Sequence, residues 1–256
     1  MRLLQVTDCH LYADPQGRSR AGFPLRQLHA VVAHARKWRP DMLLVTGDVS
    51  QDDTPASYQH AYAAFATLGC PWFWLPGNHD QQQHMTDIQP LHREVDLGGW
   101  RLVLLDTQVS GEPHGELGDE QLLALAERLE GDTRPTLLAM HHPPVKVGCA
   151  WLDAIGLADR EAFWQSLAPF AHVKAIVCGH IHQAFVGRQP IKGGEVAVYG
   201  SPATADQFLG RAREFAIDQA SRPGYRVIDL EGDTLTTWVE RVTIGRTVIS
   251  SYALMG

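Results

Sequence analysis

The sequence contains no long apolar run, and this absence bears on where the protein works. No segment of the 256 residues approaches the ~18 consecutive apolar residues that a transmembrane helix needs. The first apolar stretch, residues 3–6, is far too short for the core of a secretory signal peptide. We therefore expect a cytoplasmic protein without a membrane partner.

Paired cysteines and basic runs are missing as well. The four cysteines lie far apart, with none of the two-residue spacings of a zinc clasp or redox pair, so we expect reduced thiols. Lys and Arg form no run and the formal net charge is −7, which disfavours a nucleic-acid partner and therefore a nuclease. A small phosphate-bearing substrate stays compatible with this charge, because bound cations would invert the local field.

Short apolar runs recur along the chain, and each has the length of a strand. They span residues 3–6, 42–45, 72–75, 102–105, 136–140 and 175–178. Helical patterns cover residues 24–37 and 119–130, and a third begins at Pro55 after an N-cap at Thr54 and stops before Gly69. Apolar strands that alternate with helices indicate a sheet that is covered on both faces and at least partly parallel.

The pattern changes after Gly187. Residues 196–199, 225–230 and 235–242 are typical of antiparallel strands, with a turn between the last two. No linker, repeat or low-complexity tract divides the chain. The sequence thus predicts a single α/β domain over residues 1–256, in which a second sheet packs on the first.

Five of the six early apolar runs are followed by residues that can hold a metal ion. These residues are Asp8 and His10, Asp48, Asn78, His141, and His180 with His182. Carboxyl ends of parallel strands meet at one edge of an α/β sheet, where such sheets build their sites. A single Asp or His after a strand is ordinarily a turn or cap residue, but independent caps have no reason to share both chemistry and position. The pattern therefore favours one shared metal site.

The kind and number of these residues narrow the metal. Carboxylate, amide oxygen and imidazole, without thiolate, suit iron, manganese, zinc or cobalt better than a soft metal or an oxygen-only magnesium or calcium cage. The seven candidates exceed what one ion needs. Because Asp48 offers a carboxylate able to bridge, we expect two divalent or trivalent ions placed for an in-line displacement at phosphorus.

In their order along the chain, these motifs resemble the signature of the calcineurin-like metallophosphoesterases. The matching motifs are Asp8-x-His10, Gly47-Asp48, Gly77-Asn78-His79-Asp80, His141 and Gly179-His180-x-His182. The resemblance covers roughly residues 3–183 and implies a four-layer αββα sandwich of two mixed β-sheets flanked by helices. It also implies the ligand sets, which are Asp8, His10, Asp48 and His182 for one ion and Asn78, His141 and His180 with a bridging Asp48 for the other.

The residues between the ligands are similar to the bacterial class III 3′,5′-cyclic-AMP phosphodiesterases. The similar segments are 45–52, 75–80, 141–144 and 178–183, with further matches around 151–153, 200–202 and 207–208. This resemblance implies hydrolysis of 3′,5′-cyclic AMP to 5′-AMP by a hydroxide that bridges the ions. Other phosphodiesters stay open as substrates, including 2′,3′-cyclic nucleotides, nucleotide-sugar pyrophosphates and aryl diesters. A monomer and a homodimer are both compatible with the sequence.

Three residues are further candidates for catalysis or substrate binding. By the same resemblance, His79 follows a ligand without being one, and we expect it to neutralise developing charge or protonate the leaving oxygen, with Asp80 orienting it. A helix-capping role is the alternative for His79. Trp151 is a candidate contact for a nucleobase, and Asn78, His79 and His182 are also expected to face the substrate.

Other conspicuous residues are expected to be structural. Cys9 lies between two candidate ligands, but its side chain should point away from them into the core. Asp106 ends the remaining apolar run and should serve as a hydrogen-bonding residue. Trp72 and Trp74 alternate with Phe73 in a strand and are expected to be core residues. A non-catalytic scaffold on the same fold would be expected to have lost ligands, and none is lost here.

Overall fold

The apolar runs of the sequence become neighbouring strands of two β-sheets in the computed structural model, which describes residues 1–245. The first sheet has the order β11-β10-β1-β2-β3, and the second has the order β4-β5-β6-β7-β9-β8. The strands of the first sheet are β1 (Arg2–Val6), β2 (Met42–Thr46), β3 (Trp72–Leu75), β10 (Gly224–Glu231) and β11 (Thr234–Arg241). Those of the second are β4 (Glu94–Asp96), β5 (Arg101–Leu104), β6 (Thr136–Met140), β7 (Val173–Cys178), β8 (Phe185–Ile191) and β9 (Gly194–Gly200).

Both sheets are mixed, as the sequence predicts. Strands β1, β2 and β3 run parallel, and β10 and β11 join them antiparallel. In the second sheet β5, β6, β7 and β9 run parallel, and the edge strands β4 and β8 pair antiparallel. The parallel core of each sheet therefore delivers several strand ends to one side of the molecule.

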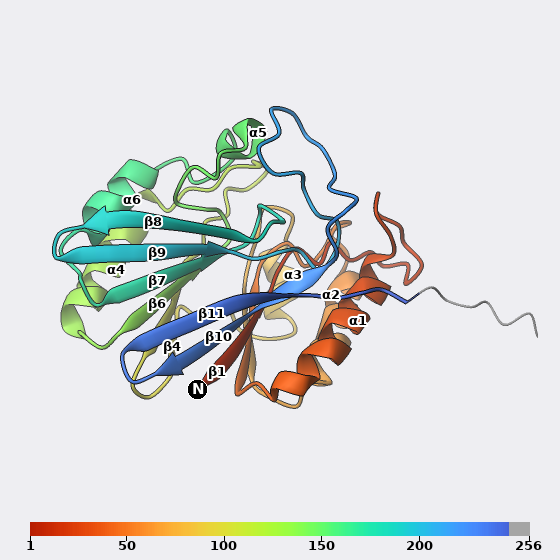
Figure 1. The fold of residues 1–256 in the computed structure, drawn as a ribbon, viewed down its shortest axis with the longest axis horizontal. Helices are drawn as coiled ribbons and strands as arrows, with labels where there is room; N and C mark the ends of the chain where they lie inside the picture. Colours follow the sequence, from red (N-terminus) through yellow and green to blue (C-terminus); the bar gives the residue numbers. More distant parts are fainter. Residues whose placement is uncertain (246–256) are drawn as a thin grey trace, which may run out of the picture.

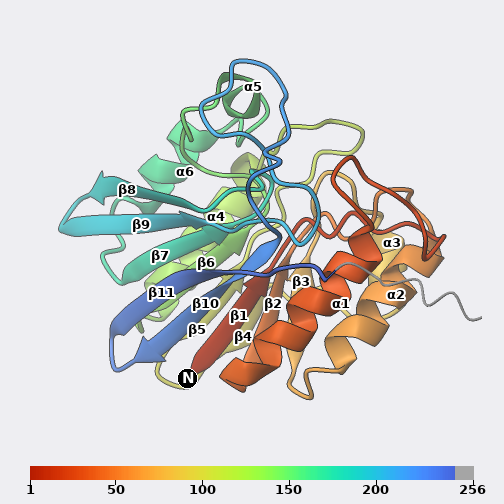
Figure 2. The same ribbon diagram turned by 45° about the vertical axis from the view of Figure 1, so that its right-hand side comes forward.

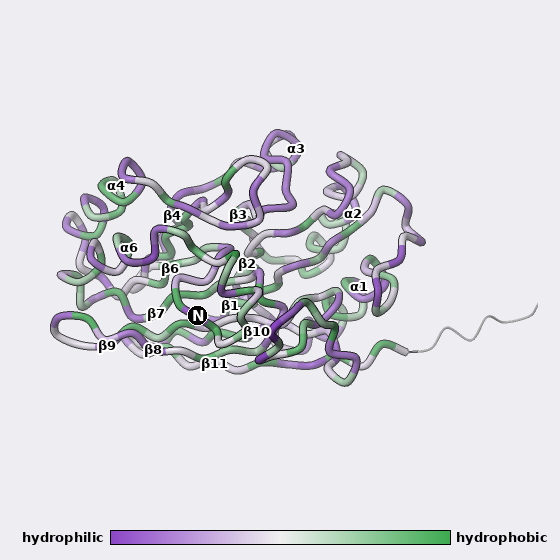
Figure 3. The backbone as a smooth tube through the Cα atoms, turned by 90° about the horizontal axis from the view of Figure 1, so that it is seen from above, coloured by the Kyte–Doolittle hydropathy of each residue, from purple (hydrophilic) through white to green (hydrophobic). Residues whose placement is uncertain are grey.

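Helices cover the outer face of each sheet, which gives a four-layer sandwich (Figure 1). Helices α1 (Pro24–Ala35) and α2 (Pro55–Ala66) lie side by side on the first sheet (Figure 2), and a 3₁₀ turn (Arg36–Trp38) follows α1. Helices α4 (Gly118–Gly131) and α6 (Arg160–Leu167) cover the second sheet, and the short helices α3 (Gln82–Thr86) and α5 (Ala150–Asp153) lie in loops. The loop around α3 is hydrophilic (Figure 3).

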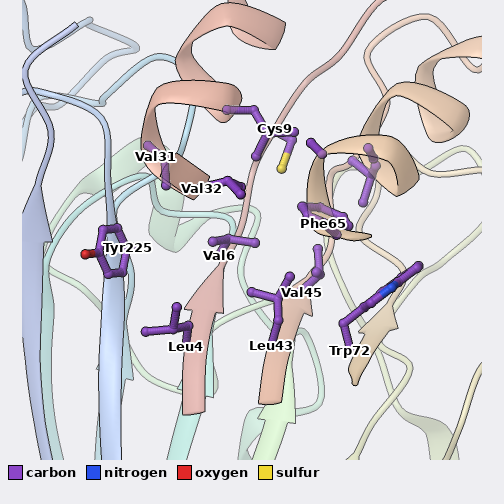
Figure 4. Packing of buried hydrophobic residues seen from close by; sticks show 14 of the residues in the cluster. Leu4, Val6, Cys9, Val31, Val32, Leu43, Val45, Phe65, Trp72 and Tyr225 are labelled. Atoms are coloured by element: carbon purple, nitrogen blue, oxygen red, sulfur yellow. The ribbon is translucent and has the colours of Figure 1, made fainter. Parts of the chain in front are cut away.

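The near-continuous apolar character of the central strands has a simple cause, which is that both of their faces are buried. Leu4 and Val6 of β1 point toward α1 and α2 (Figure 4), whereas the intervening side chains point the other way. Leu3 accordingly packs between the two sheets with Leu104 and Leu137. Each fully buried Leu, Val or Phe side chain stabilises the fold by roughly 1.5–3 kcal/mol.

Most of the predicted elements are confirmed, and the exceptions have physical reasons. Thr54 is the N-cap residue of α2, but its hydroxyl donates to Asp52 and accepts no hydrogen bond from the backbone of the helix. Strand β8 escaped prediction because it is an edge strand whose residues alternate between half-buried and exposed and include a glycine and Pro190. The short strand β4 gave no pattern either.

The residues that the sequence predicts to pack in the core are buried in the structure. Trp74 and Cys9 are fully buried, and Trp72 is 8% exposed. None of the helices within residues 1–245 is long and apolar enough to cross a membrane. The single domain over residues 1–256 stays a prediction, since residues 246–256 lie outside the described part of the chain.

Candidate metal centre

The predicted ligands meet where strands of both sheets end. Asp8 and His10 follow β1, Asp48 follows β2, Asn78 follows β3, His141 follows β6, and His180 and His182 follow β7. All of them are buried except Asn78, which is half-buried. Both sheets therefore contribute to one cluster. Its ligands come from five loops that are far apart in the sequence.

One group of ligand atoms forms around two imidazoles. The Nε2 atoms of His10 and His182 are 3.1 Å apart. His182 Nε2 lies 3.3 Å from Asp8 Oδ1, and His10 Nε2 lies 3.6 Å from Asp48 Oδ2. Two nitrogens and two carboxylate oxygens thus surround one small space.

A second group forms around the side-chain oxygen of Asn78. This Oδ1 atom lies 3.2 Å from His141 Nε2 and 3.1 Å from His180 Nδ1. His141 Nε2 is also 3.4 Å from Asp48 Oδ1. Asp48 therefore offers one carboxylate oxygen to each group, which is the arrangement of a bridging carboxylate.

Hydrogen bonds behind the cluster orient two of its imidazoles. His141 Nδ1 lies 2.8 Å from the carbonyl oxygen of Thr46, and His182 Nδ1 lies 2.6 Å from that of Asp206. A carbonyl oxygen can only accept, so each Nδ1 donates and each Nε2 is the ring atom left to bind a metal ion.

The charge of the cluster also fits metal ions. Asp8 and Asp48 are 0% and 2% exposed, and their only ion-pair partners in residues 1–245 are imidazoles of the cluster. Two buried carboxylates surrounded by histidines call for cations with oxygen and nitrogen ligands. The residues present therefore fit a pair of such ions.

The pKa shifts follow from burial and from the Asp48 charge. Burial opposes ionisation of Asp48, but the nearby His141 and His10 outweigh it and hold its pKa well below its ordinary value. Burial lowers the pKa of His10 to about 4. Burial also opposes protonation of His141, yet Asp48 raises its pKa to about 9, so a metal ion at Nε2 would replace a proton.

Backbone strain is concentrated in the same residues. Eight non-glycine residues within 1–245 have positive φ, and five of these are candidate ligands. They are Asp8, His10, Asp48, His180 and His182, with φ between 46° and 66°. Such conformations are sparsely populated, although Asp and His tolerate them better than most residues, and they cluster at functional sites.

The motif glycines are required by close approach. A Cβ atom on Gly77 would overlap Asp48 Oδ1, and one on Gly179 would overlap the hydroxyl of Thr7. Gly47 has φ +89°, and its Cβ would lie 2.6 Å from His141 Nδ1. The glycines thus let the strand ends come close enough for their ligands to meet.

His79 lies at the open side of the cluster. Its backbone N–H donates to Asp48 Oδ1 over 2.9 Å, and its ring meets that of His10 edge-on with centroids 5.1 Å apart. A ring nitrogen of His79 lies within 4.8 Å of ligand atoms of His10 and Asp48. The side chain is more exposed than the ligands and lines the adjacent cavity.

Asp80 is used differently from the sequence expectation that it orients His79. Its carboxylate accepts hydrogen bonds from the backbone N–H groups of Val49, Ser50 and Gly77 and from the hydroxyl of Tyr58. Within residues 1–245 it makes no hydrogen bond to His79. Asp80 therefore ties the loop after β2 to the loop after β3, and acts on His79 only through the backbone.

A cavity of about 640 Å³ opens beside the cluster. His10, Asp48, Asn78, His79, His180 and His182 line its inner end. Trp151 lines it too, and packs edge-on against Phe208 and Phe215 at centroid distances of 5.1 and 5.2 Å. The space is large enough for a nucleotide-sized ligand.

Sequence reasoning missed several residues of this cavity. Phe208 stacks face-to-face on His182, with centroids 3.8 Å apart and planes 10° apart. Arg18, Arg20 and Phe215 also line the wall. No sequence spacing connects these residues, because they come from loops that meet only in the folded chain. Asp106, by contrast, has the structural role expected, since it accepts from the backbone of Gln108 and the side chain of Gln82.

Comparison with known proteins identifies relatives over nearly the whole chain. Residues 1–184 match the family model of the calcineurin-like phosphoesterases. The 3′,5′-cyclic adenosine monophosphate phosphodiesterase CpdA of Vibrio vulnificus (strain CMCP6) is 42% identical, over 96% of this chain and 91% of its own length. The enzyme of the same name from Escherichia coli (strain K12) is 37% identical over 94% of this chain and 90% of its own length.

Solved structures with this architecture are more distant in sequence. A dimetal phosphatase from Danio rerio superposes with a TM-score of 0.63 at 14% identity, covering 95% of this chain and 99% of that one. The purple acid phosphatase PPD1 from yellow lupin gives a TM-score of 0.66 at 13% identity, over 94% of this chain and 51% of its own. These likenesses support the four-layer fold, and the matches in sequence go further: the chain belongs to the calcineurin-like phosphoesterase family.

Proposed function

We propose that this chain hydrolyses 3′,5′-cyclic AMP to 5′-AMP at a centre of two metal ions. The observation that carries the proposal is the position of Asp48, whose two carboxylate oxygens face two separate groups of ligand atoms. The relatives named as cyclic-AMP phosphodiesterases, which align with more than nine-tenths of the chain, support the choice of substrate.

In this proposal each ion has its own ligand set. Asp8, His10, Asp48 and His182 hold one ion, and Asn78, His141, His180 and Asp48 hold the other. The donor atoms suit iron, manganese, zinc or cobalt. When bound, such a pair supplies Lewis acidity toward phosphoryl oxygens and a water that is nucleophilic near neutral pH.

The chain's own residues orient the diester and handle the proton. Hydrolysis adds the oxygen of water to phosphorus, breaks the bond from phosphorus to O3′, and requires a proton on the departing O3′. His79 lies at the cavity wall with its backbone fixed on Asp48, which suits a donor of that proton. Burial of the ligands shields the inner side of the cluster from bulk water, and the open side faces the cavity.

The nucleoside occupies the remainder of the cavity. Trp151 offers an aromatic surface there, so Trp151→Ala is expected to raise the KM for cyclic AMP more than it lowers kcat. Cyclic AMP is an intracellular metabolite, so the proposed activity belongs in the cytoplasm. It needs no nucleic-acid or membrane partner, and the proposed enzyme is a monomer or homodimer.

A substrate panel tests the proposal. Protein loaded with Mn²⁺ or Fe²⁺ is assayed with 3′,5′-cyclic AMP, 2′,3′-cyclic AMP, a nucleotide-sugar pyrophosphate and bis(4-nitrophenyl) phosphate, and products are separated by chromatography. We expect the highest kcat/KM for 3′,5′-cyclic AMP, with 5′-AMP as product. Ready cleavage of the aryl diester without turnover of cyclic AMP at millimolar concentration would leave only the broader phosphodiesterase assignment.

A further inference from the structure

Asp206 joins the metal centre to a loop that is remote in sequence. Its carbonyl oxygen accepts the hydrogen bond from Nδ1 of His182. Its carboxylate accepts from the backbone N–H groups of Arg20 and Ala21, both over 3.0 Å, and from the hydroxyl of Ser19. The residue is only 8% exposed, so these bonds are largely shielded from water.

Asp206 is the main anchor of the middle of this loop, whereas Asp52 and His60 bind its beginning at Ala13. Residues 12–23 form the later part of the connection from β1 to α1 and contain no helix or strand. A local turn links the backbone of Ser19 to Gly22, and Asp206 accepts the long-range hydrogen bonds that Ser19, Arg20 and Ala21 make within residues 1–245. In Figure 2 this loop (red) rises on the same side of the molecule as the segment that carries Asp206 (blue).

The loop completes one wall of the cavity. The guanidinium group of Arg20 lies 4.8 Å from the ring centroid of Phe215. Phe215 packs against Phe208 at 5.3 Å, and Phe208 stacks on the candidate ligand His182. A continuous row of π-systems therefore leads from the metal centre to Arg20.

The chemistry of this row suits a nucleobase. Phe215 is 44% exposed and lines the cavity, so its ring is accessible to a ligand there. Aromatic side chains and a guanidinium plane are surfaces on which a heteroaromatic base stacks, while the phosphate of the same molecule sits at the metals.

We propose that Asp206 is a positioning residue, whose carboxylate holds residues 19–21 so that Arg20 and Phe215 form the outer wall of a nucleoside subsite. This role rests on the proposed hydrolysis of a cyclic nucleotide, whose nucleoside Arg20 and Phe215 would recognise. The side chain of Asp206 acts through Arg20, whereas its carbonyl oxygen serves His182 independently.

The test separates nucleoside binding from metal binding. Asp206→Ala removes the three carboxylate bonds and keeps the backbone carbonyl. Arg20→Met removes the guanidinium from an exposed position, where folding should be unaffected. For both variants we expect the KM for cyclic AMP and the Kd for 5′-AMP to rise about tenfold, the scale of one lost favourable contact. The metal content per chain should stay at the wild-type value.

Two comparisons sharpen the result. The ratio of kcat/KM for cyclic AMP to that for methyl 4-nitrophenyl phosphate, which has no nucleoside, should fall about tenfold in both variants. The double variant should be no worse than Asp206→Ala alone, because the two residues act in series. Asp218→Ala is the matched control. Asp218 lies in the same segment between β9 and β10, and its carboxylate accepts three hydrogen bonds from Ala220 and Ser221. It should leave this ratio at the wild-type value.

Other outcomes overturn the inference. A KM within twofold of wild type in both variants would show that the wall does not bind the nucleoside. Loss of metal in Asp206→Ala would make its carboxylate part of the support of the metal centre instead. If Arg20→Met impaired only a nucleotide-sugar pyrophosphate, the arginine would serve a second phosphate. Should Asp206→Ala fail to fold, Asp206→Asn and Arg20→Met carry the test, and absence of wild-type turnover of cyclic AMP would count against the proposed function alone.

Discussion

At the scale of single residues, the metal centre depends on backbone positions as much as on side chains. Five candidate ligands hold left-handed conformations, each costing of the order of 1–3 kcal/mol. This cost is met by the surrounding bonds and packing. The glycines beside the ligands are needed for a different reason, which is that a Cβ atom there would overlap a ligand side chain or a residue packed against the cluster.

Gly77 provides a direct test of this requirement. A methyl group at this position would overlap Asp48 Oδ1 and lie 2.8 Å from His141 Cε1, both in the second ligand group. Gly77→Ala is therefore expected to lose at least one of two bound metal ions per chain, as measured by elemental analysis. Gly99→Ala, where no atom lies within 4 Å of the added Cβ, is the control and should retain both. Full metal content in Gly77→Ala would contradict this prediction, because it would show that the loop can move to make room for the methyl group.

His79 should matter for turnover and not for holding metal. His79→Ala is expected to keep the metal content and lower kcat by about 10²–10⁴, the usual scale for a positioned proton donor. Elemental analysis and steady-state kinetics on the same preparation provide the check. His29→Ala, at an exposed position, should behave as wild type. A fall in metal content with activity would instead identify His79 as a ligand.

At the scale of elements, the centre requires that loops after adjacent strands stay in register. Asp80 does this on the first sheet by binding the loop after β2 and the loop after β3 at once. Between the sheets, the Gln5 side chain donates to Thr46 Oγ1 and to the carbonyl oxygen of Cys178. An apolar side chain in place of Gln5 would leave the buried Thr46 hydroxyl and the Cys178 carbonyl without this donor.

Removal of the Asp80 carboxylate should therefore loosen both loops. Asp80→Ala leaves three backbone N–H groups and the Tyr58 hydroxyl without their acceptor, and we expect a loss of about 3 kcal/mol in the free energy of unfolding. Metal affinity should fall as well, as seen by titration of the metal-free protein. Asp159→Ala is the control, since Asp159 accepts from the backbone of Leu117 and Gly118 at the start of α4, which covers the other sheet. It should lower stability without changing metal affinity, and an equal effect on metal would refute a specific role for Asp80.

At the scale of the whole molecule, strand ends of both sheets form the candidate centre, so we expect metal binding and folding to be coupled. Treatment with a chelator leaves Asp8 and Asp48 buried without a cation, and should lower the melting temperature. A ligand at 100 times its Kd stabilises by about 2.7 kcal/mol, which sets the scale of the expected recovery with Mn²⁺. Differential scanning calorimetry measures the shift. Asp48→Ala should show little response to chelator, and an equal shift there would place the stabilising ions elsewhere.

Much of the fold was predictable because its information is local. The strands of the parallel core are buried on both faces, so each reads as a short apolar run that ends in a ligand. The rule that carboxyl ends of parallel strands share an edge then placed Asp8 beside Asp48 on the first sheet, and His141 beside His180 on the second. That the two edges meet depends on how the sheets pack. Edge strand β8 was missed because its half-exposed residues carry no such pattern.

The sequence by itself determined which residues gather at the candidate metal centre and which layers surround them. The tertiary structure alone decided the position of Asp80 under the loops, the stacking of Phe208 on His182, and the hold of Asp206 on residues 19–21. The partners of Asp206 lie 185–187 positions away in the chain. No periodicity or spacing encodes such contacts, because they form between irregular loops whose paths depend on the packing of both sheets.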